Sequence, residues 1–209
     1  MIVLVRHGEA AGAAGRAIGQ QDLPLSARGR EQASKLAQGL AQGLAAGLGR
    51  VAWAGLYASP LARARDTLAP LAAAAGLVPV LREGLAEISL GRWEGLAWSD
   101  IRARFPAEHA ARGRDLAGYR PPGGESFADL AARAGAVLDE LAAGPLPVLA
   151  VTHAGVVRVL LARVLGLPLQ EIFRLSPQEG RCTALTPHAQ GLRLAGFNLS
   201  PSDMAGLVD

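Results

Sequence analysis

Arg6 and His7 are the first residues of this chain that could do chemistry, and they directly follow a short apolar run, residues 2–5. The planar guanidinium of an arginine suits phosphate or carboxylate oxygens. A positive neighbour favours the neutral form of a histidine, and a neutral imidazole nitrogen is a nucleophile. The pair therefore indicates attack on a phosphoryl group. A structural histidine at the end of a strand explains two such residues equally well.

A second histidine repeats this arrangement late in the chain. His153 follows the apolar run of residues 147–152 and precedes Ala154 and Gly155, where a glycine turn opens a helix. Backbone N–H groups at the start of a helix favour a bound anion. A histidine that serves only packing would also fit these positions, so the interpretation of this segment depends on the other segments.

Arg63 belongs to a third segment of this kind, because it closely follows an apolar strand pattern that ends at Ser59-Pro60. Ligands of open α/β sheets bind outside the carboxyl ends of the strands. We therefore expect Arg63 to meet the first arginine and both histidines at one edge of the sheet. In this arrangement the two imidazoles should face each other across one phosphoryl group.

Strand patterns alternate with helix patterns along the chain, which is typical of a parallel sheet covered on both faces. The fold class predicted is α/β, a three-layer αβα sandwich with a mostly parallel central sheet and one antiparallel edge. Strands are expected at 2–5, 51–58, 78–81, 147–152, 181–186 and 191–197, and helices at 27–49, 61–75, 127–143 and 156–165. Regularly spaced glycines at 39, 43 and 47 suggest that the first helix packs closely against the sheet.

The composition favours one soluble domain over residues 1–209, with a lid or insert at about 84–126. The chain has 209 residues, 50% of them hydrophobic, and a net charge of +3 without a basic stripe, so neither nucleic acid nor a membrane is expected as a partner. A lone Cys182 excludes a disulfide framework, and a cytoplasmic location is expected. The oligomeric state is left open between monomer and homodimer.

Five blocks of residues, in order along the chain, resemble the histidine phosphatase superfamily, the phosphoglycerate mutase-like group. They are Arg6-His7-Gly8-Glu9; Pro24-Leu25-Ser26 with Gly29 and Gln32; Ser59-Pro60-Leu61 with Arg63-Ala64; Glu87 with Gly91-Arg92-Trp93-Glu94-Gly95; and His153-Ala154-Gly155. The resemblance extends from the first residue to about residue 166. It implies an enzyme that needs no cofactor and acts on a small-molecule phosphomonoester.

The resemblance implies catalytic roles for five residues. His7 would become phosphohistidine, while Arg6, Arg63 and His153 surround the phosphoryl oxygens, to which Ala154 would add its N–H. Glu87 would protonate the leaving alcohol and then activate water. A general acid of this kind contributes typically about 10²–10⁴ to the rate, because an alkoxide leaves poorly.

Two points of this assignment stay open. Glu83 and Glu94 compete with Glu87 for the role of the acid. The family often has an asparagine in the loop after the nucleophile, and here that loop has none, so either Gln20 or Gln21 supplies the contact or it is missing.

A metal site is the rival interpretation of the two histidines. His7 and His153 could both be ligands, but an arginine beside a ligand repels a cation. No metal is therefore expected. Phosphate charge would instead be neutralised by fixed cations and N–H donors.

The substrate is expected to be a monophosphate whose far end is not a polyanion. Only residues 88–152 separate the acid from the second histidine, which leaves no room for the long insertion of mutases, and residues 84–125 hold six arginines and six acidic residues. The blocks at 91–95, 121–126 and 152–158 are similar to those of alpha-ribazole phosphatases of cobalamin biosynthesis. The resemblance also allows a broad-specificity phosphatase or a phosphoglycerate mutase, and a non-catalytic phosphate-binding protein is a further alternative.

Three aromatic residues of the lid bear on this choice. Trp93, Trp98 and Tyr119 could stack on the benzimidazole of an alpha-ribazole phosphate. Packing within the lid explains them equally well.

Overall fold

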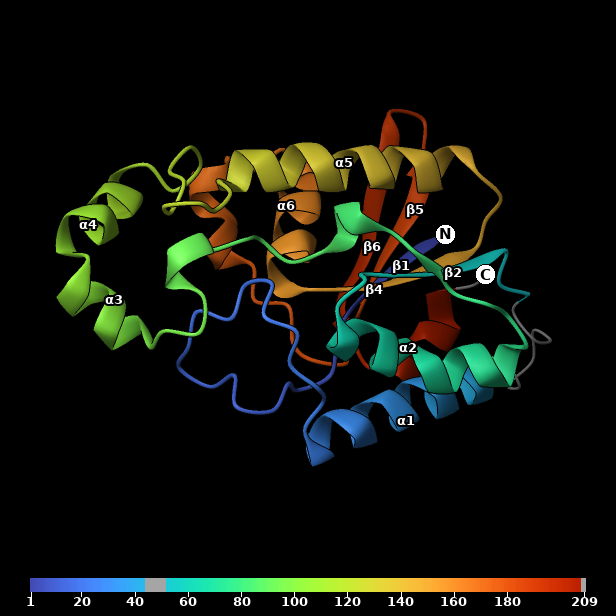
Figure 1. The fold of residues 1–209 in the computed structure, drawn as a ribbon. Helices are drawn as coiled ribbons and strands as arrows, with labels where there is room; N and C mark the ends of the chain where they lie inside the picture. Colours follow the sequence, from blue (N-terminus) through green and yellow to red (C-terminus); the bar gives the residue numbers. More distant parts are fainter. Residues whose placement is uncertain (44–51, 208–209) are drawn as a thin grey trace.

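A six-stranded mixed sheet forms the centre of the computed structural model, which describes residues 1–43 and 52–207 (Figure 1). Its strand order is β3-β2-β4-β1-β5-β6. The strands are β1 (Ile2–Arg6), β2 (Gly55–Ala58), β3 (Val80–Leu81), β4 (Val148–Thr152), β5 (Cys182–His188) and β6 (Gly191–Leu199). The first four are parallel, and β5 and β6 add antiparallel pairings at one edge, so the predicted sheet is confirmed.

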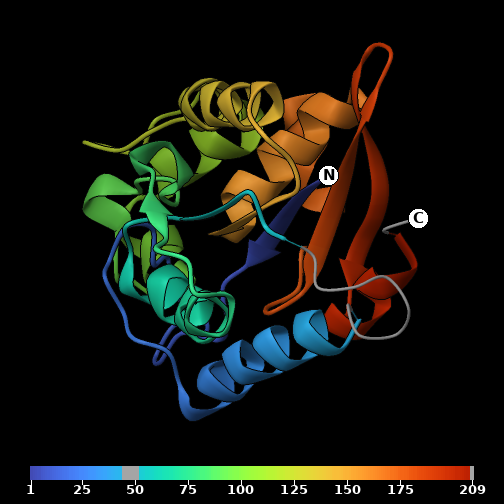
Figure 2. The ribbon, with the colours of Figure 1, turned by 90° about the vertical axis from the view of Figure 1, so that its right-hand side faces the viewer.

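Helices cover both faces of this sheet, as Figures 1 and 2 show. One face carries α1 (Ala27–Gly43) and α2 (Ala62–Ala75), and the other carries α5 (Phe127–Ala143) and α6 (Ala154–Leu165). Each face has its own apolar core. Residues 2–5 are fully buried because successive strand side chains point to opposite faces: Val3 and Val5 join the core with α1 and α2, while Ile2 and Leu4 join the other.

The predicted ends of several elements differ from the structure. Strand β2 begins only at Gly55, and α6 begins already at Ala154. Residues 44–49 of the first expected helix, including Gly47, lie outside the described residues. Gly39 approaches η4 (Pro201–Leu207) rather than the sheet, since a Cβ there would lie 2.6 Å from Pro201 Cβ.

The expected lid contains two short helices that the sequence patterns did not predict. They are α3 (Trp98–Arg104) and α4 (Pro106–Arg114), and the shorter turns η1 (Glu83–Leu85), η2 (Gly91–Trp93) and η3 (Leu169–Arg174) complete the described helical elements. Trp93 is fully buried and stacks on Tyr119, with ring centroids 5.8 Å apart. These two aromatic residues therefore serve packing.

The strand register brings three strand ends to one edge of the sheet. Arg6 pairs with Thr152, and Ala58 pairs with Val151. The residue that follows each of β1, β2 and β4 consequently emerges beside the other two.

Within the residues described, no helix has the length and apolarity needed to cross a membrane.

Candidate active site

His7 directly follows β1 and is held through both ring nitrogens. Its Nδ1 lies 2.6 Å from the carbonyl oxygen of Gly8, and Arg63 donates from Nε to His7 Nε2 at 3.2 Å. A carbonyl can only accept and a guanidinium can only donate, so Nδ1 carries the proton and Nε2 offers a lone pair. Burial, followed by the charges of Arg63 and Arg6, lowers the pKa of His7 to about 3 against the opposing bond to Gly8. The imidazole is therefore a neutral nucleophile.

His153, the residue after β4, lies beside this nucleophile. The two ring centroids are 5.0 Å apart, but the rings meet at 62°, edge to face rather than face to face as expected. His153 Nε2 lies 2.7 Å from Ser59 Oγ, while its buried Nδ1 has no hydrogen-bond partner in the described part of the chain. Burial, and then His7, lowers the pKa of His153. Nδ1 is thus available to a ligand.

Arg6 directly precedes the nucleophile at the end of β1, whereas Arg63 reaches it from α2. Arg63 lies in α2 and donates from Nη1 to the carbonyl of Gln21 at 2.7 Å and from Nη2 to that of Gly19 at 2.8 Å. Arg6 forms an ion pair with Glu179 at 2.9 Å. The structure therefore brings both predicted arginines to His7 and fixes each by contacts with surrounding loops.

Two buried hydroxyl groups, which the sequence patterns did not single out as site residues, fix the strand ends. Thr67 Oγ1 accepts from Gly8 N at 2.9 Å and donates to the carbonyl of Arg63 at 2.6 Å, so α2 is tied to the turn after the nucleophile. Ser59 holds the second histidine. In the sequence, only the position of Ser59 at the Ser59-Pro60 end of β2 indicated that it could belong to the site. For Thr67, only its position one helical turn after Arg63 did so.

Glu87 reaches the start of α6. Its Oε2 accepts from Gly155 N at 3.2 Å and its Oε1 from Ile88 N at 3.0 Å. A Cβ at residue 155 would lie 2.3 Å from Glu87 Oε1, so any larger residue there would displace the end of the Glu87 side chain. Glu94 instead accepts from the backbone N–H groups of Gln20 and Leu90, at 3.0 Å each. The placement favours Glu87 over Glu94 as the acid.

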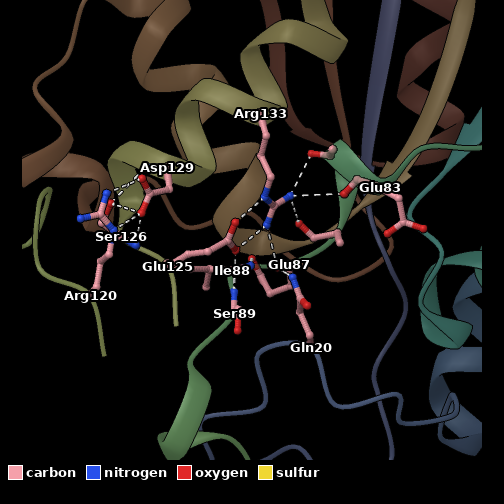
Figure 3. A network of polar contacts seen from close by, with 12 residues as sticks. Gln20, Glu83, Glu87, Ile88, Ser89, Arg120, Glu125, Ser126, Asp129 and Arg133 are labelled. Carbon is pink, nitrogen blue, oxygen red and sulfur yellow. Dashed lines mark hydrogen bonds and ion pairs between the residues drawn. The ribbon is translucent and has the colours of Figure 1, made fainter. Parts of the chain in front are cut away.

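Arg133 of α5 anchors the segment that carries Glu87 (Figure 3). It donates to the carbonyl oxygens of Ala86 at 2.7 Å and Glu87 at 2.9 Å, and it forms a two-pronged ion pair with Glu125 at 2.8 and 2.9 Å. Glu125 in turn accepts from Ser89 N at 2.8 Å. This network was missed, because its signal is only an arginine and a glutamate eight residues apart.

Gln20 does not lie where the sequence placed it. Its side-chain amide donates to the carbonyl of Glu87 at 2.9 Å (Figure 3). Gln21 contributes its backbone carbonyl to Arg63. The predicted replacement for the asparagine is therefore corrected: Gln20 supports the acid segment, and neither glutamine lines the cavity.

A cavity of about 380 Å³ opens in front of these groups. Its wall includes His7, Arg6, Arg63, Glu87 and Ala154, the last at the N-terminus of α6. Of the three lid aromatics only Trp98 reaches the wall. The described residues include no group of three or more potential metal ligands, and the guanidinium on His7 Nε2 does not suit a metal there.

The described groups form a site suited to a phosphoryl group. A neutral imidazole lies in the wall of a cavity that also holds guanidiniums, a helix N-terminus and a carboxylate. Fixed donors of this kind stabilise negative charge that develops on a transferred group. The fold and the site thus fit an enzyme that acts on phosphate compounds.

The comparisons with known proteins specify this class further. The profile of the histidine phosphatase superfamily, branch 1, matches residues 2–200, and the chain belongs to this superfamily as one of its phosphatases. Glucosyl-3-phosphoglycerate phosphatase of Mycobacterium tuberculosis is 35% identical over 179 residues, 80% of this chain and 76% of that protein. A probable phosphoglycerate mutase of Yersinia enterocolitica is 37% identical over 177 residues, 80% and 75% of the two chains.

Solved structures give the same assignment. A mycobacterial glucosyl-3-phosphoglycerate phosphatase in complex with VO3 superposes with a TM-score of 0.81 at 34% identity, covering 95% of this chain and 98% of that one. Alpha-ribazole phosphatase from Shigella flexneri superposes with a TM-score of 0.83 at 26% identity, covering 94% and 95%.

Proposed function

We propose that the protein hydrolyses phosphomonoesters in two steps through a phosphohistidine at residue 7. His7 Nε2 attacks phosphorus and the ester P–O bond breaks, while Glu87 transfers its proton to the leaving alcohol. The carboxylate then takes a proton from water, which attacks phosphorus and breaks the P–N bond. Inorganic phosphate leaves, and His7 returns to its neutral form.

The residues around the nucleophile would stabilise the charge of the transferred group. Arg6, Arg63 and the unpaired Nδ1 of His153 donate to its oxygens, and the N–H of Ala154 contributes the N-terminus of α6. The observation that carries the proposal is the pair of contacts on His7, a residue of the cavity wall, since they leave its Nε2 unprotonated. The reaction as proposed requires no metal.

Hydrolysis of p-nitrophenyl phosphate by the purified protein tests this function. We expect turnover that a chelator does not reduce, and a phosphoenzyme that is labile in acid and stable in base when the reaction is quenched early. His7→Ala should reduce turnover to the solution background without loss of the fold, as circular dichroism would show. Turnover that persists in His7→Ala, or that a chelator abolishes, would contradict the proposal.

Two substrates follow from the relatives, and each has its own support. Alpha-ribazole 5′-phosphate, as expected from the sequence blocks, is supported by the structural similarity to alpha-ribazole phosphatases and by Trp98 in the cavity wall. Glucosyl-3-phosphoglycerate is supported by the 35% identity to the mycobacterial phosphatases. Comparison of kcat/KM for these two esters decides between them.

A further inference from the structure

Besides Arg16, which donates to the carbonyl of Gly95, two further guanidiniums lie in the cavity wall beyond the catalytic groups. Arg112 comes from α4 and Arg158 from α6, yet both lie against the same ring: their Cζ atoms are 5.6 and 5.0 Å from the centroid of Phe173. Arg112 also lies over Trp98, at 5.5 Å. A guanidinium stacked on a ring keeps its in-plane N–H donors for another partner.

These two cations have no carboxylate to neutralise them. Neither forms an ion pair in the part of the chain that the structure describes, whereas the two carboxylates in the cavity wall are both engaged: Glu179 with Arg6, and Glu87 with backbone N–H groups. Of the lid residues counted from the sequence, one arginine, Arg112, and one acid, Glu87, line the cavity, so the lid itself contributes one charge of each sign. The charge that faces the cavity is positive because the arginines outside the lid outnumber the one further carboxylate, Glu179.

Their position relates them to the leaving group. Arg158 lies four residues after Ala154 on α6, so both are on one face of that helix and about 6 Å apart along its axis. Glu87, the proposed proton donor to the leaving alcohol, contacts the first turn of the same helix. Its charge also opposes the lowering of the Arg158 pKa by burial. The remainder of the leaving alcohol would thus extend toward both arginines.

We infer that Arg112 and Arg158 bind a carboxylate on the leaving alcohol, so that the preferred substrates are phosphate esters of hydroxy acids. This inference rests on the proposed function, because it assigns the leaving-group end of the same cavity. The ring-stacked guanidiniums present their donors in a plane, which matches a planar anion. Phe173 and Trp98 provide the apolar surface beneath it.

Binding to the His7→Ala variant, which cannot turn substrate over, tests the inference by calorimetry. The probes are 3-phosphoglycerate and glycerol 3-phosphate, which differ only by a carboxylate in place of a hydroxymethyl group. We expect roughly tenfold or greater tighter binding of 3-phosphoglycerate, since a site with buried charged donors rejects the analogue that leaves them unpaired. O-phosphoserine and O-phosphoethanolamine form a second pair, which differs by a carboxylate in place of a hydrogen atom.

The variants Arg112→Gln and Arg158→Gln, made in the His7→Ala background, should bring this ratio of affinities close to one. Arg114→Gln is the matched control: it removes a positive charge from the same helix α4, but Arg114 is exposed and does not line the cavity, so the ratio should stay unchanged. Arg158→Lys keeps the charge without the fork and should retain part of the preference.

Three results would overturn the inference. These are equal binding of the two probes, an equal loss of both probes in the glutamine variants, and tighter binding of a bisphosphate than of 3-phosphoglycerate, which would indicate a second phosphate site. Thermal unfolding identifies a variant that fails to fold, and the lysine variants then replace it. Lack of p-nitrophenyl phosphate hydrolysis by the unaltered protein would refute the proposed function alone, because the ratio of affinities does not depend on turnover.

Discussion

The tautomer and protonation state of the histidines at the site are set by the groups in direct contact with them rather than by more distant parts of the fold. The carbonyl of Gly8 selects the tautomer of His7, and burial with two adjacent guanidiniums keeps that ring neutral. Ser59 does the corresponding work for His153 by occupying its Nε2. In each histidine, one ring nitrogen is held by such a neighbour, Nδ1 in His7 and Nε2 in His153. The other ring nitrogen is the one proposed to contact the phosphoryl group.

Glu87→Gln is expected to slow alkyl phosphates by about 10²–10⁴ and p-nitrophenyl phosphate much less, because a good leaving group needs no proton. The measurement is kcat/KM for both esters. Glu83→Gln serves as the control, since Glu83 does not line the cavity, and both rates should stay close to those of the unaltered protein. If Glu87→Gln slows the two esters equally, Glu87 is not the acid.

Elements act on the site through their ends and their close contacts. The first turn of α6 comes so near Glu87 that a Cβ on residue 155 would displace its carboxylate. The segment of Glu87 is fixed from its other side by α5 through Arg133. The acid is therefore positioned between two helices of the same layer.

Gly155→Ala should displace Glu87, and kcat should fall by roughly tenfold or more, since a misplaced acid loses most of its contribution. Gly113→Ala is the matched control in helix α4: nothing lies within 4 Å of a Cβ there, so activity should persist and stability should rise by up to about 1 kcal/mol. An active Gly155→Ala variant would show that the contact with Glu87 is dispensable.

Arg133→Gln is expected to cost roughly 2–4 kcal/mol of unfolding free energy, because Glu125 and several carbonyl oxygens lose a charged donor. Urea unfolding measures this change, and kcat should fall with little change in the KM of p-nitrophenyl phosphate. Arg163→Gln, which breaks an exposed pair with Asp139, is the control, with an expected cost below about 1 kcal/mol. Equal costs for the two variants would mean that Arg133 does not anchor the acid segment.

The sequence predicted the strand-end residues well and the supporting contacts poorly. Apolar runs that stop at His7 and His153 reveal their own positions, because a parallel sheet gathers the ends of its strands at one edge. Arg133 and Arg112 carry no such signal, since the direction of a helical side chain depends on the neighbours that the fold supplies. The short helices α3 and α4 were missed for the same reason, as seven and nine residues hold too little periodicity to distinguish them from a loop.

At the scale of the whole molecule, the site depends on strands that are distant in sequence. β4 lies between β1 and β2, although it follows both of them in the chain. The nucleophile and Ser59 are therefore brought to opposite sides of His153 only when β4 has joined the sheet between β1 and β2.

Acidification should destabilise the whole protein below about pH 6.5. Burial lowers the pKa of His7 to about 3 and that of His153 in the same direction. The unfolded chain therefore takes up protons that the folded protein refuses, and the unfolding free energy falls with pH by up to about 1.4 kcal/mol per unit for each histidine. At higher pH both states are neutral, and this loss is absent.

Urea unfolding at several pH values between 7.5 and 5 measures that dependence. The double variant His7→Asn with His153→Asn removes both imidazoles, so its unfolding free energy should decline less steeply than that of the unaltered protein over this interval. Equal slopes would show that the two histidines do not resist protonation in the folded state.

The bond from Arg63 Nε to His7 Nε2 has one more consequence. In the resting protein this N–H covers the very electron pair that must reach phosphorus, so attack releases the guanidinium at the moment when an incoming ester offers oxygens to receive it. Electrophiles without such oxygens, alkyl halides for example, would break the bond with nothing in exchange. We therefore expect His7 to react more readily with phosphate esters than with alkyl halides.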